Sequence, residues 1–130
     1  MNQRGFATLE VILMVMIIGI LASIAVPRFT SITTSANTAK IQSDLSTIDT
    51  AIAIYYMEKG RYPTNLKTDL KPYLNDIDNI KPPTGKAYID DGTTWDISGE
   101  YEITTPTGEM EPRATLNGKT SGQFVKKSSS

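Results

Sequence analysis

One acidic residue, Glu10, stands immediately before a long run of apolar and small residues. The run extends from Val11 to Pro27 and contains no charged side chain. An ionisable group at the edge of a membrane-length segment is costly to bury, so its presence indicates a function and a partner group. A Gly5-Phe6 junction lies four residues before Glu10, behind a short polar leader. The chemistry to be explained is therefore that of a carboxylate beside a hydrophobic segment.

Cleavage of the chain after Gly5 would supply the partner group. It would create a free α-amino group on Phe6, and Glu10 lies four residues further along. At the rise of an α-helix the two positions are about 6 Å apart along the axis and on nearly the same face. An amine and a carboxylate on neighbouring subunits could then neutralise each other in an apolar environment, where an unpaired charge is costly.

Two other interpretations fit the same segment. The uncharged run has roughly 17 residues, the lower limit for a helix that crosses a bilayer, so it could be a simple signal anchor. It could also be a secretory signal peptide with a small-residue cleavage site at Ser23-Ile24-Ala25. A signal peptide usually has a shorter hydrophobic region and a more basic start. The three interpretations predict different mature N-termini, at Met1, Phe6 and Val26.

The N-terminal motif resembles the class III signal of type IV pilins and pseudopilins. The resemblance rests on the motif Gly5-Phe6-Ala7-Thr8-Leu9-Glu10 and on the apolar run after it, which ends in Gly19-Ile20-Leu21-Ala22-Ser23-Ile24-Ala25-Val26-Pro27. It implies that a prepilin peptidase cuts after Gly5 and methylates the new N-terminal Phe6. It also implies that Glu10 promotes the docking of subunits into a filament.

The same resemblance implies a biological setting. The chain would be a structural subunit of either a type IV pilus or a type II secretion pseudopilus, and it would polymerise with copies of itself through its N-terminal helix. Its partners would be a prepilin peptidase, an inner-membrane assembly platform and an assembly ATPase. It would first span the bacterial inner membrane once, with its soluble head outside the cytoplasm, and later form an extracellular or periplasmic filament. The alternative is a membrane-anchored binding module with the helix as its tether.

The composition of the 130-residue chain argues against several other functions. The 13 basic and 14 acidic residues give a net charge of −1, and the basic residues are scattered, so no nucleic-acid footprint is expected. Histidine and cysteine are absent, which removes the commonest general base and thiolate chemistry. We expect no enzyme activity, no cofactor and no metal site. Asp90, Asp91 and Asp96 offer oxygen ligands, but without the dense acidic and glycine-rich loop of a calcium site.

An amphipathic helix is predicted after the hydrophobic segment. Apolar residues recur there at helical spacing and predict one buried stripe, which consists of Ile41, Leu45, Ile48, Ile52 and Tyr55. We expect the stripe to extend toward the N-terminus through Phe29, Ile32, Ala36 and Ala39. A coiled-coil seam has similar spacing, but this stripe is short and lacks flanking Glu and Lys. The preferred partner of the stripe is therefore the C-terminal part of the same chain.

The patterns predict an α+β fold with a long N-terminal helix packed against a small antiparallel β-sheet, which is the pilin fold in the family that the motif resembles. The predicted segments are a leader, a hydrophobic assembly helix, an amphipathic helix, a connecting loop with short helical turns, and a sheet with a polar tail. In chain order these are residues 1–5, 6–27, 28–60, 61–86 and 87–130. Gly19 and Pro27 weaken the helix locally and predict a kink.

The C-terminal region contains three short β-prone runs, residues 87–90, 93–98 and 100–105. Asp91-Gly92 predicts a hairpin between the first two runs, and Asn117-Gly118 predicts a weaker one near the end.

Upstream of these strands, Thr64 or Asn65 is expected to cap a short helical stretch. The preceding turn, Gly60-Arg61-Tyr62-Pro63, is similar to that of major pseudopilins of type II secretion. Those proteins typically carry an Asp-Pro-Trp-Gly motif and a calcium loop, which this chain lacks.

Overall fold

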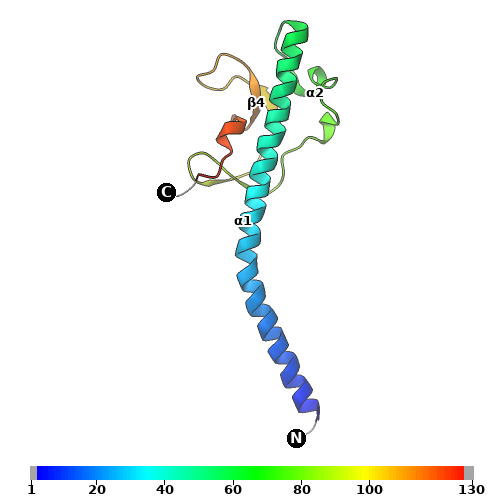
Figure 1. Ribbon diagram of the computed structural model, residues 1–130, viewed down its shortest axis with the longest axis vertical. Coiled ribbons are helices and arrows are strands. Elements are labelled where there is room, and N and C mark those ends of the chain that lie inside the picture. Colours follow the sequence, from blue (N-terminus) through cyan, green and yellow to red (C-terminus); the bar gives the residue numbers. More distant parts are fainter. Residues whose placement is uncertain (1–2, 128–130) are drawn as a thin grey trace. The chain divides into compact units, whose positions relative to one another are not determined.

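The computed structural model describes residues 3–127, except for the side chains of residues 25–28, and it has an α+β fold. The chain divides into two compact units, one within the first 33 residues and the other from Thr34 onward. The long helix α1 (Gln3–Lys59) contributes to both units (Figure 1). We call the unit from Thr34 onward the head.

The rest of the head consists of short elements that lie beside the second half of α1 (Figure 1). In chain order these are α2 (Leu66–Asp69), η1 (Ile77–Asn79), β1 (Lys86–Tyr88), β2 (Thr94–Asp96), β3 (Tyr101–Thr104), β4 (Arg113–Leu116) and η2 (Ser121–Gln123). The predicted cap is Asn65, whose side-chain oxygen accepts hydrogen bonds from the backbone N–H groups of Lys67 and Thr68, each at 3.1 Å. The helical stretch after it is short, as the nearby Pro72 predicts.

The first sheet is the predicted hairpin of β1 and β2. The strands pair antiparallel, with Ala87 opposite Trp95. In the turn, Gly92 has a φ of 90°, and the Asp91 carboxylate accepts a hydrogen bond from the backbone N–H of Thr93 at 2.8 Å. Asp91-Gly92 therefore forms the turn that its residue types predict.

The second sheet pairs β3 with β4, so the predicted single sheet is two separate two-stranded sheets. Ile103 lies opposite Ala114 in this antiparallel pair. The third predicted run does not continue the first sheet because Gly99, with a φ of 84°, turns the chain between β2 and β3. After β4, Asn117-Gly118 forms the predicted tight turn, across which Leu116 and Lys119 exchange backbone hydrogen bonds.

The predicted stripe of α1 is the centre of the head's core. All five of its members are at most 4% exposed, and they pack with residues of every sheet and of the chain end. Phe124, Leu70 and Leu116 complete this cluster and are fully buried. The stripe is covered by its own chain, as preferred over a coiled-coil seam.

The predicted extension of the stripe is wrong. Ala36 and Ala39 are exposed, and Phe29 and Ile32 are 66% and 63% exposed. The buried face continues instead through polar residues, namely Thr38, Asn37 and Thr34. Helical geometry places these three on the face of Ile41, whereas the four apolar residues lie on the opposite face.

Candidate functional site

Gly5, Phe6 and Glu10, which are assigned to processing and docking, all lie on α1. Phe6 and Glu10 are four positions apart, and both are exposed, Phe6 to 58%. Among residues 3–127, apart from its chain neighbours Arg4 and Phe6, no side chain lies within 4 Å of the point where a Cβ of Gly5 would be. The peptide bond after Gly5 and the carboxylate of Glu10 are thus on the exposed surface of the same helix.

The hydrophobic segment of α1 is exposed along its length. Its large apolar residues from Phe6 to Ile24 are between 51% and 63% exposed. By length and composition α1 is able to cross a membrane. Apolar surface left in water costs about 25 cal/mol per Å². This segment therefore requires lipid or neighbouring protein around it.

The two residues predicted to kink the helix lie within α1. The backbone is helical at both Gly19 and Pro27. The side chain of Pro27 lies outside the described part of the chain, and the kink stays a prediction.

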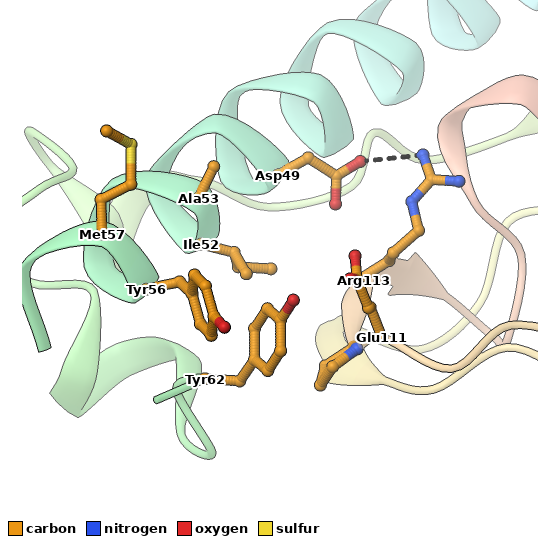
Figure 2. Close-up of a pocket in the computed structure, with 9 residues that line it drawn as sticks. Asp49, Ile52, Ala53, Tyr56, Met57, Tyr62, Glu111 and Arg113 are labelled. Carbon is orange, nitrogen blue, oxygen red and sulfur yellow. Dashed lines mark hydrogen bonds and ion pairs between the residues drawn. The ribbon is translucent and has the colours of Figure 1, made fainter. Parts of the chain in front are cut away.

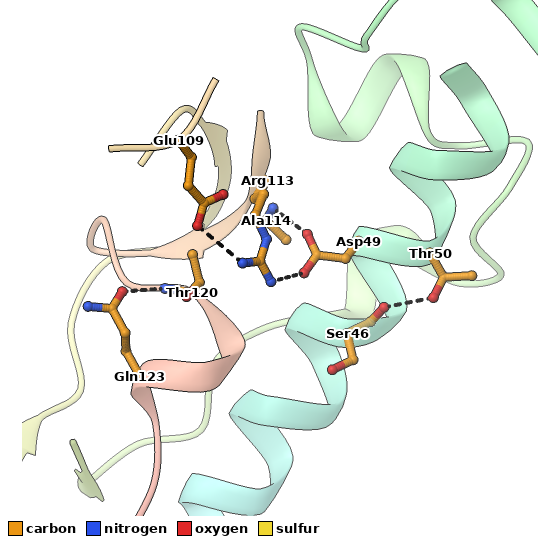
Figure 3. A network of polar contacts seen from close by, with 8 residues as sticks. All are labelled: Ser46, Asp49, Thr50, Glu109, Arg113, Ala114, Thr120 and Gln123. Atoms are coloured by element: carbon orange, nitrogen blue, oxygen red, sulfur yellow. Dashed lines mark hydrogen bonds and ion pairs between the residues drawn. The ribbon is translucent and has the colours of Figure 1, made fainter. Parts of the chain in front are cut away.

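In the head, two aspartates of α1 bind the second sheet. Asp44 accepts a hydrogen bond from the Tyr101 hydroxyl of β3 at 2.7 Å. Asp49 accepts one from the backbone N–H of Ala114 at 2.8 Å and forms an ion pair with Arg113 at 3.2 Å, both on β4 (Figure 3). Since these contacts join fixed positions on the helix to fixed positions on the strands, they set the register of the sheet on α1.

Buried polar residues of α1 bind the first hairpin in the same way. The side-chain amide of Asn37 donates to the backbone carbonyls of Thr84 and Lys86, each at 3.1 Å. The hydroxyl of Thr38 accepts a hydrogen bond from the backbone N–H of Tyr88 at 2.8 Å. Buried polar groups must find partners, so this end of the head docks by hydrogen bonding as well as by the apolar packing of Ala87 and Ile89.

The chain end is held on α1 by Phe124. Its backbone carbonyl accepts a hydrogen bond from Gln42, and its ring lies 6.0 Å from that of Trp95. The turn before it is closed by Thr120 and Gln123, whose side chain accepts a hydrogen bond from the Thr120 backbone N–H at 2.9 Å (Figure 3). The segment after Phe124 therefore begins at a position that is fixed relative to Gln42 of α1.

Gln42, Asp44 and Asp49 are polar residues that lie between members of the apolar stripe in the sequence, where contact with solvent is the usual expectation. Each of them binds the head. Asp44 precedes Leu45 and Asp49 follows Ile48, so both border the apolar stripe. A polar residue next to a member of the buried stripe in the sequence therefore indicates a side chain of α1 that could form a hydrogen bond or ion pair with the rest of the head.

The hydroxyl of Tyr101 is strongly perturbed by its surroundings. Burial raises its pKa far above the ordinary value, and the hydrogen bond to the negatively charged Asp44 raises it further. Both causes favour the protonated hydroxyl, which is the form that donates to Asp44.

We expect the free energy of unfolding to fall as pH rises above about 10, where a tyrosine in the unfolded chain ionises. The hydroxyl of folded Tyr101 keeps its proton at this pH. Its contribution to the free energy of unfolding is therefore fully present below about pH 10 and is lost progressively as the pH rises further. Tyr101→Phe should remove this part of the pH dependence and cost about 1–2 kcal/mol at neutral pH. Urea unfolding of the detergent-solubilised chain at neutral pH and above about pH 10 measures the loss of stability and the change in its pH dependence.

Tyr88→Phe is the matched control at neutral pH, because a phenyl ring retains the surface contact with Lys126. It should change the free energy of unfolding by less than about 0.5 kcal/mol. An unchanged pH dependence in Tyr101→Phe would contradict the role given to this hydroxyl.

An open groove of about 350 Å³ lies between the end of α1 and the segment before β4 (Figure 2). Its floor includes Met57 and the rings of Tyr56 and Tyr62, which stack with their centroids 4.4 Å apart. Glu111 lies beside Tyr62. Desolvation raises the pKa of Tyr62, and the hydrogen bond to the Glu111 carboxylate adds to the shift. The groove thus combines aromatic surface with a carboxylate.

Two of the three aspartates considered as oxygen ligands, Asp91 and Asp96, have other partners. Asp91 binds the backbone N–H and the hydroxyl of Thr93, which lower its pKa. Asp96 forms an ion pair with Lys86 at 3.3 Å. Within residues 3–127, no group of three or more acidic, histidine or cysteine residues could hold a metal ion. That the chain has no metal site stays a prediction.

Comparison with known proteins finds relatives in secretion and pilus systems. The type II secretion system core protein G of Klebsiella michiganensis is 30% identical over 112 residues, which cover 81% of this chain and 75% of that protein. The corresponding protein of Dickeya chrysanthemi is 36% identical over 112 residues, covering 81% and 70%. A type IV major pilin of Myxococcus xanthus is 37% identical over 112 residues, covering 86% of this chain and 42% of that protein. No family model and no solved structure matches the chain.

The fold and these relatives lead to one assignment. The chain has a long N-terminal helix with an exposed apolar segment, and an α+β head built on the same helix. Its relatives are pseudopilins and type IV pilins over most of its length. The chain therefore belongs to the superfamily of type IV pilins and type II secretion pseudopilins, and it is a structural subunit of a pilus or pseudopilus filament.

Proposed function

We propose that this chain is made as a single-pass precursor in the bacterial inner membrane, with its head outside the cytoplasm, and is polymerised after removal of residues 1–5. One observation carries the proposal. The apolar side chains of α1 up to Ile24 are more than half exposed, whereas the head has a closed core of its own. Lipid covers these side chains before assembly, and the helices of neighbouring subunits cover them in the filament.

Docking in this proposal is an electrostatic contact between subunits. A prepilin peptidase cuts after Gly5 and methylates Phe6, and the resulting amine meets Glu10 of an adjacent subunit. The exposure of Phe6 and Glu10 on α1 supports this pairing. Within an apolar core the pair neutralises two charges that would each be costly alone.

The chain contributes structure, and the energy for assembly comes from elsewhere. Its sequence has no glycine-rich phosphate loop that would bind a nucleotide. We therefore assign extrusion to a separate assembly ATPase that acts through an inner-membrane platform, and we assign no enzyme activity or cofactor to the chain. The finished filament is extracellular for a pilus and periplasmic for a pseudopilus.

Intact-mass measurement on protein extracted from membranes tests the proposal. The expected mass is that of a chain that begins at Phe6 and carries one methyl group. A chain that begins at Met1 would indicate a tethered binding module. A chain that begins at Val26 would indicate a secreted protein released by signal peptidase. Either of these results would exclude the processed filament subunit.

A further inference from the structure

We propose that the groove between the end of α1 and the segment before β4 binds the C-terminal segment of a second copy of this chain, residues Val125–Lys127. The inference rests on the proposed function, because it concerns how heads contact one another in the filament. It adds a contact between heads to the contact between N-terminal helices.

The groove has the surface of a binding site. Met57 is 83% exposed and Tyr56 is 43% exposed, so much of its apolar floor is uncovered. Met110, on the adjoining loop between β3 and β4, is 98% exposed. Apolar side chains this exposed are typical of surfaces that contact another protein when they share one groove, as Met57 and Tyr56 do.

The charge around the groove is negative. The acidic residues Asp49 and Glu111 line it, and Glu109 lies in the adjoining loop. Arg113 is the one basic residue among the described lining residues, and it already pairs with Asp49 at 3.2 Å and Glu109 at 3.3 Å. A ligand that carries positive charge beside an apolar side chain therefore complements the groove.

The C-terminal segment of the chain has this composition. After Glu111 the sequence contains four basic residues and no acidic residue. Val125 is 40% exposed, and Lys126 and Lys127 are both exposed. The ammonium of Lys126 lies on the surface, 5.3 Å from the centre of the Tyr88 ring. The segment thus offers one apolar side chain and two cations to a neighbour.

The C-terminal segment and the groove lie at different levels along α1. This difference determines how far two copies must be displaced for the segment of one to reach the groove of the other. The hydrogen bond from Gln42 to the backbone of Phe124 fixes the start of the segment at the level of Gln42. The groove lies further along, from Asp49 to Met57. At the rise of an α-helix these levels differ by about 10–22 Å.

Two parallel copies displaced along their helices by this distance bring the segment of one to the groove of the other. Such a contact uses two different surfaces, so each copy can bind the next without closing into a ring. Repetition of a contact of this kind builds a helical filament.

Disulfide cross-linking tests the contact directly, because the chain has no cysteine of its own. Met57→Cys and Lys127→Cys are introduced into separate copies, which are produced together in cells that assemble the filament. A disulfide-linked dimer of the two variants is expected after oxidation. The matched control replaces Lys127→Cys by Lys67→Cys, an exposed lysine on α2, and should give no dimer.

Charge reversal supplies a second measurement. Lys126→Glu with Lys127→Glu should reduce the resistance of filaments to shear, and Lys126→Glu alone should reduce the yield of dimer cross-linked through Lys127→Cys, because like charges then face each other. Glu109→Lys with Glu111→Lys in the same chain should restore both. The two tail lysines are exposed, so their reversal leaves the core of the head intact.

The outcomes separate this inference from the proposed function. Filaments that form without the Met57–Lys127 disulfide would overturn the contact while the filament assignment stands. Linkage of Met57→Cys copies only to each other, or only to another protein, would also overturn it. Failure of the unsubstituted chain to form filaments in its own cells would overturn the proposed function, and the inference with it.

Discussion

Replacing Glu10 by alanine is expected to abolish filament assembly while synthesis and membrane insertion of the chain continue. In the docking contact proposed above, the variant leaves the Phe6 amine of a neighbouring subunit without a carboxylate in an apolar core. Removal of one partner from a buried ion pair costs about 3–5 kcal/mol. Since each 1.4 kcal/mol changes an equilibrium about tenfold, each subunit addition should weaken by about two to three and a half orders of magnitude.

The measurement compares filament yield, by electron microscopy and shearing, with the amount of the chain in membranes. Ser23→Ala is the matched control, because Ser23 is an exposed polar residue of the same helix that bonds only its own backbone in the contacts described. It should assemble normally. Normal filaments from Glu10→Ala would refute the docking role of the carboxylate.

Replacing Phe124 by alanine should destabilise the head by about 3–5 kcal/mol, the usual cost of truncating a buried aromatic side chain. Phe124 is fully buried and packs beside Trp95. Small domains have only about 5–15 kcal/mol of stability in total. The variant should therefore unfold at a much lower urea concentration, as followed by the fluorescence of the single tryptophan.

Val125→Ala is the control for this loss. Val125 is the next residue along the chain and is 40% exposed, so its truncation should cost less than about 0.5 kcal/mol. Equal unfolding curves for the two variants would show that Phe124 does not close the core.

The sequence predicted those elements that depend on local rules. The stripe from Ile41 to Tyr55 follows helical periodicity over four turns, and it is buried as predicted. Asn65 caps a helix and Asp91-Gly92 forms a hairpin turn because these residue types satisfy backbone groups near them.

Strand β4 was predicted only through the weaker hairpin signal at Asn117-Gly118, and its composition explains why. Ala114, Thr115 and Leu116 are all buried, so the alternation of apolar and polar residues that marks a half-buried strand is absent. The strand is identified by its pairing with β3, which is a long-range property.

The polar contacts between α1 and the strands of the head also could not be predicted from the sequence. Asn37 and Asp49 are common surface residues, and only the tertiary arrangement shows that each satisfies backbone groups of a strand. The roles of Gly5, Phe6 and Glu10 are predicted by their motif and stay predictions. The structure contributes their exposure on one helix.

The division of the head into two hairpins has a consequence for how quickly it folds. Each hairpin pairs strands that are neighbours in the sequence, β1 with β2 and β3 with β4. Contacts that are close in sequence form early and fast, but an isolated hairpin is only marginally stable in water. Because α1 precedes both hairpins in the chain, each can dock on a helix that has already been synthesised. Each hairpin can therefore dock on α1 as the chain emerges, and Phe124 docks last and closes the core.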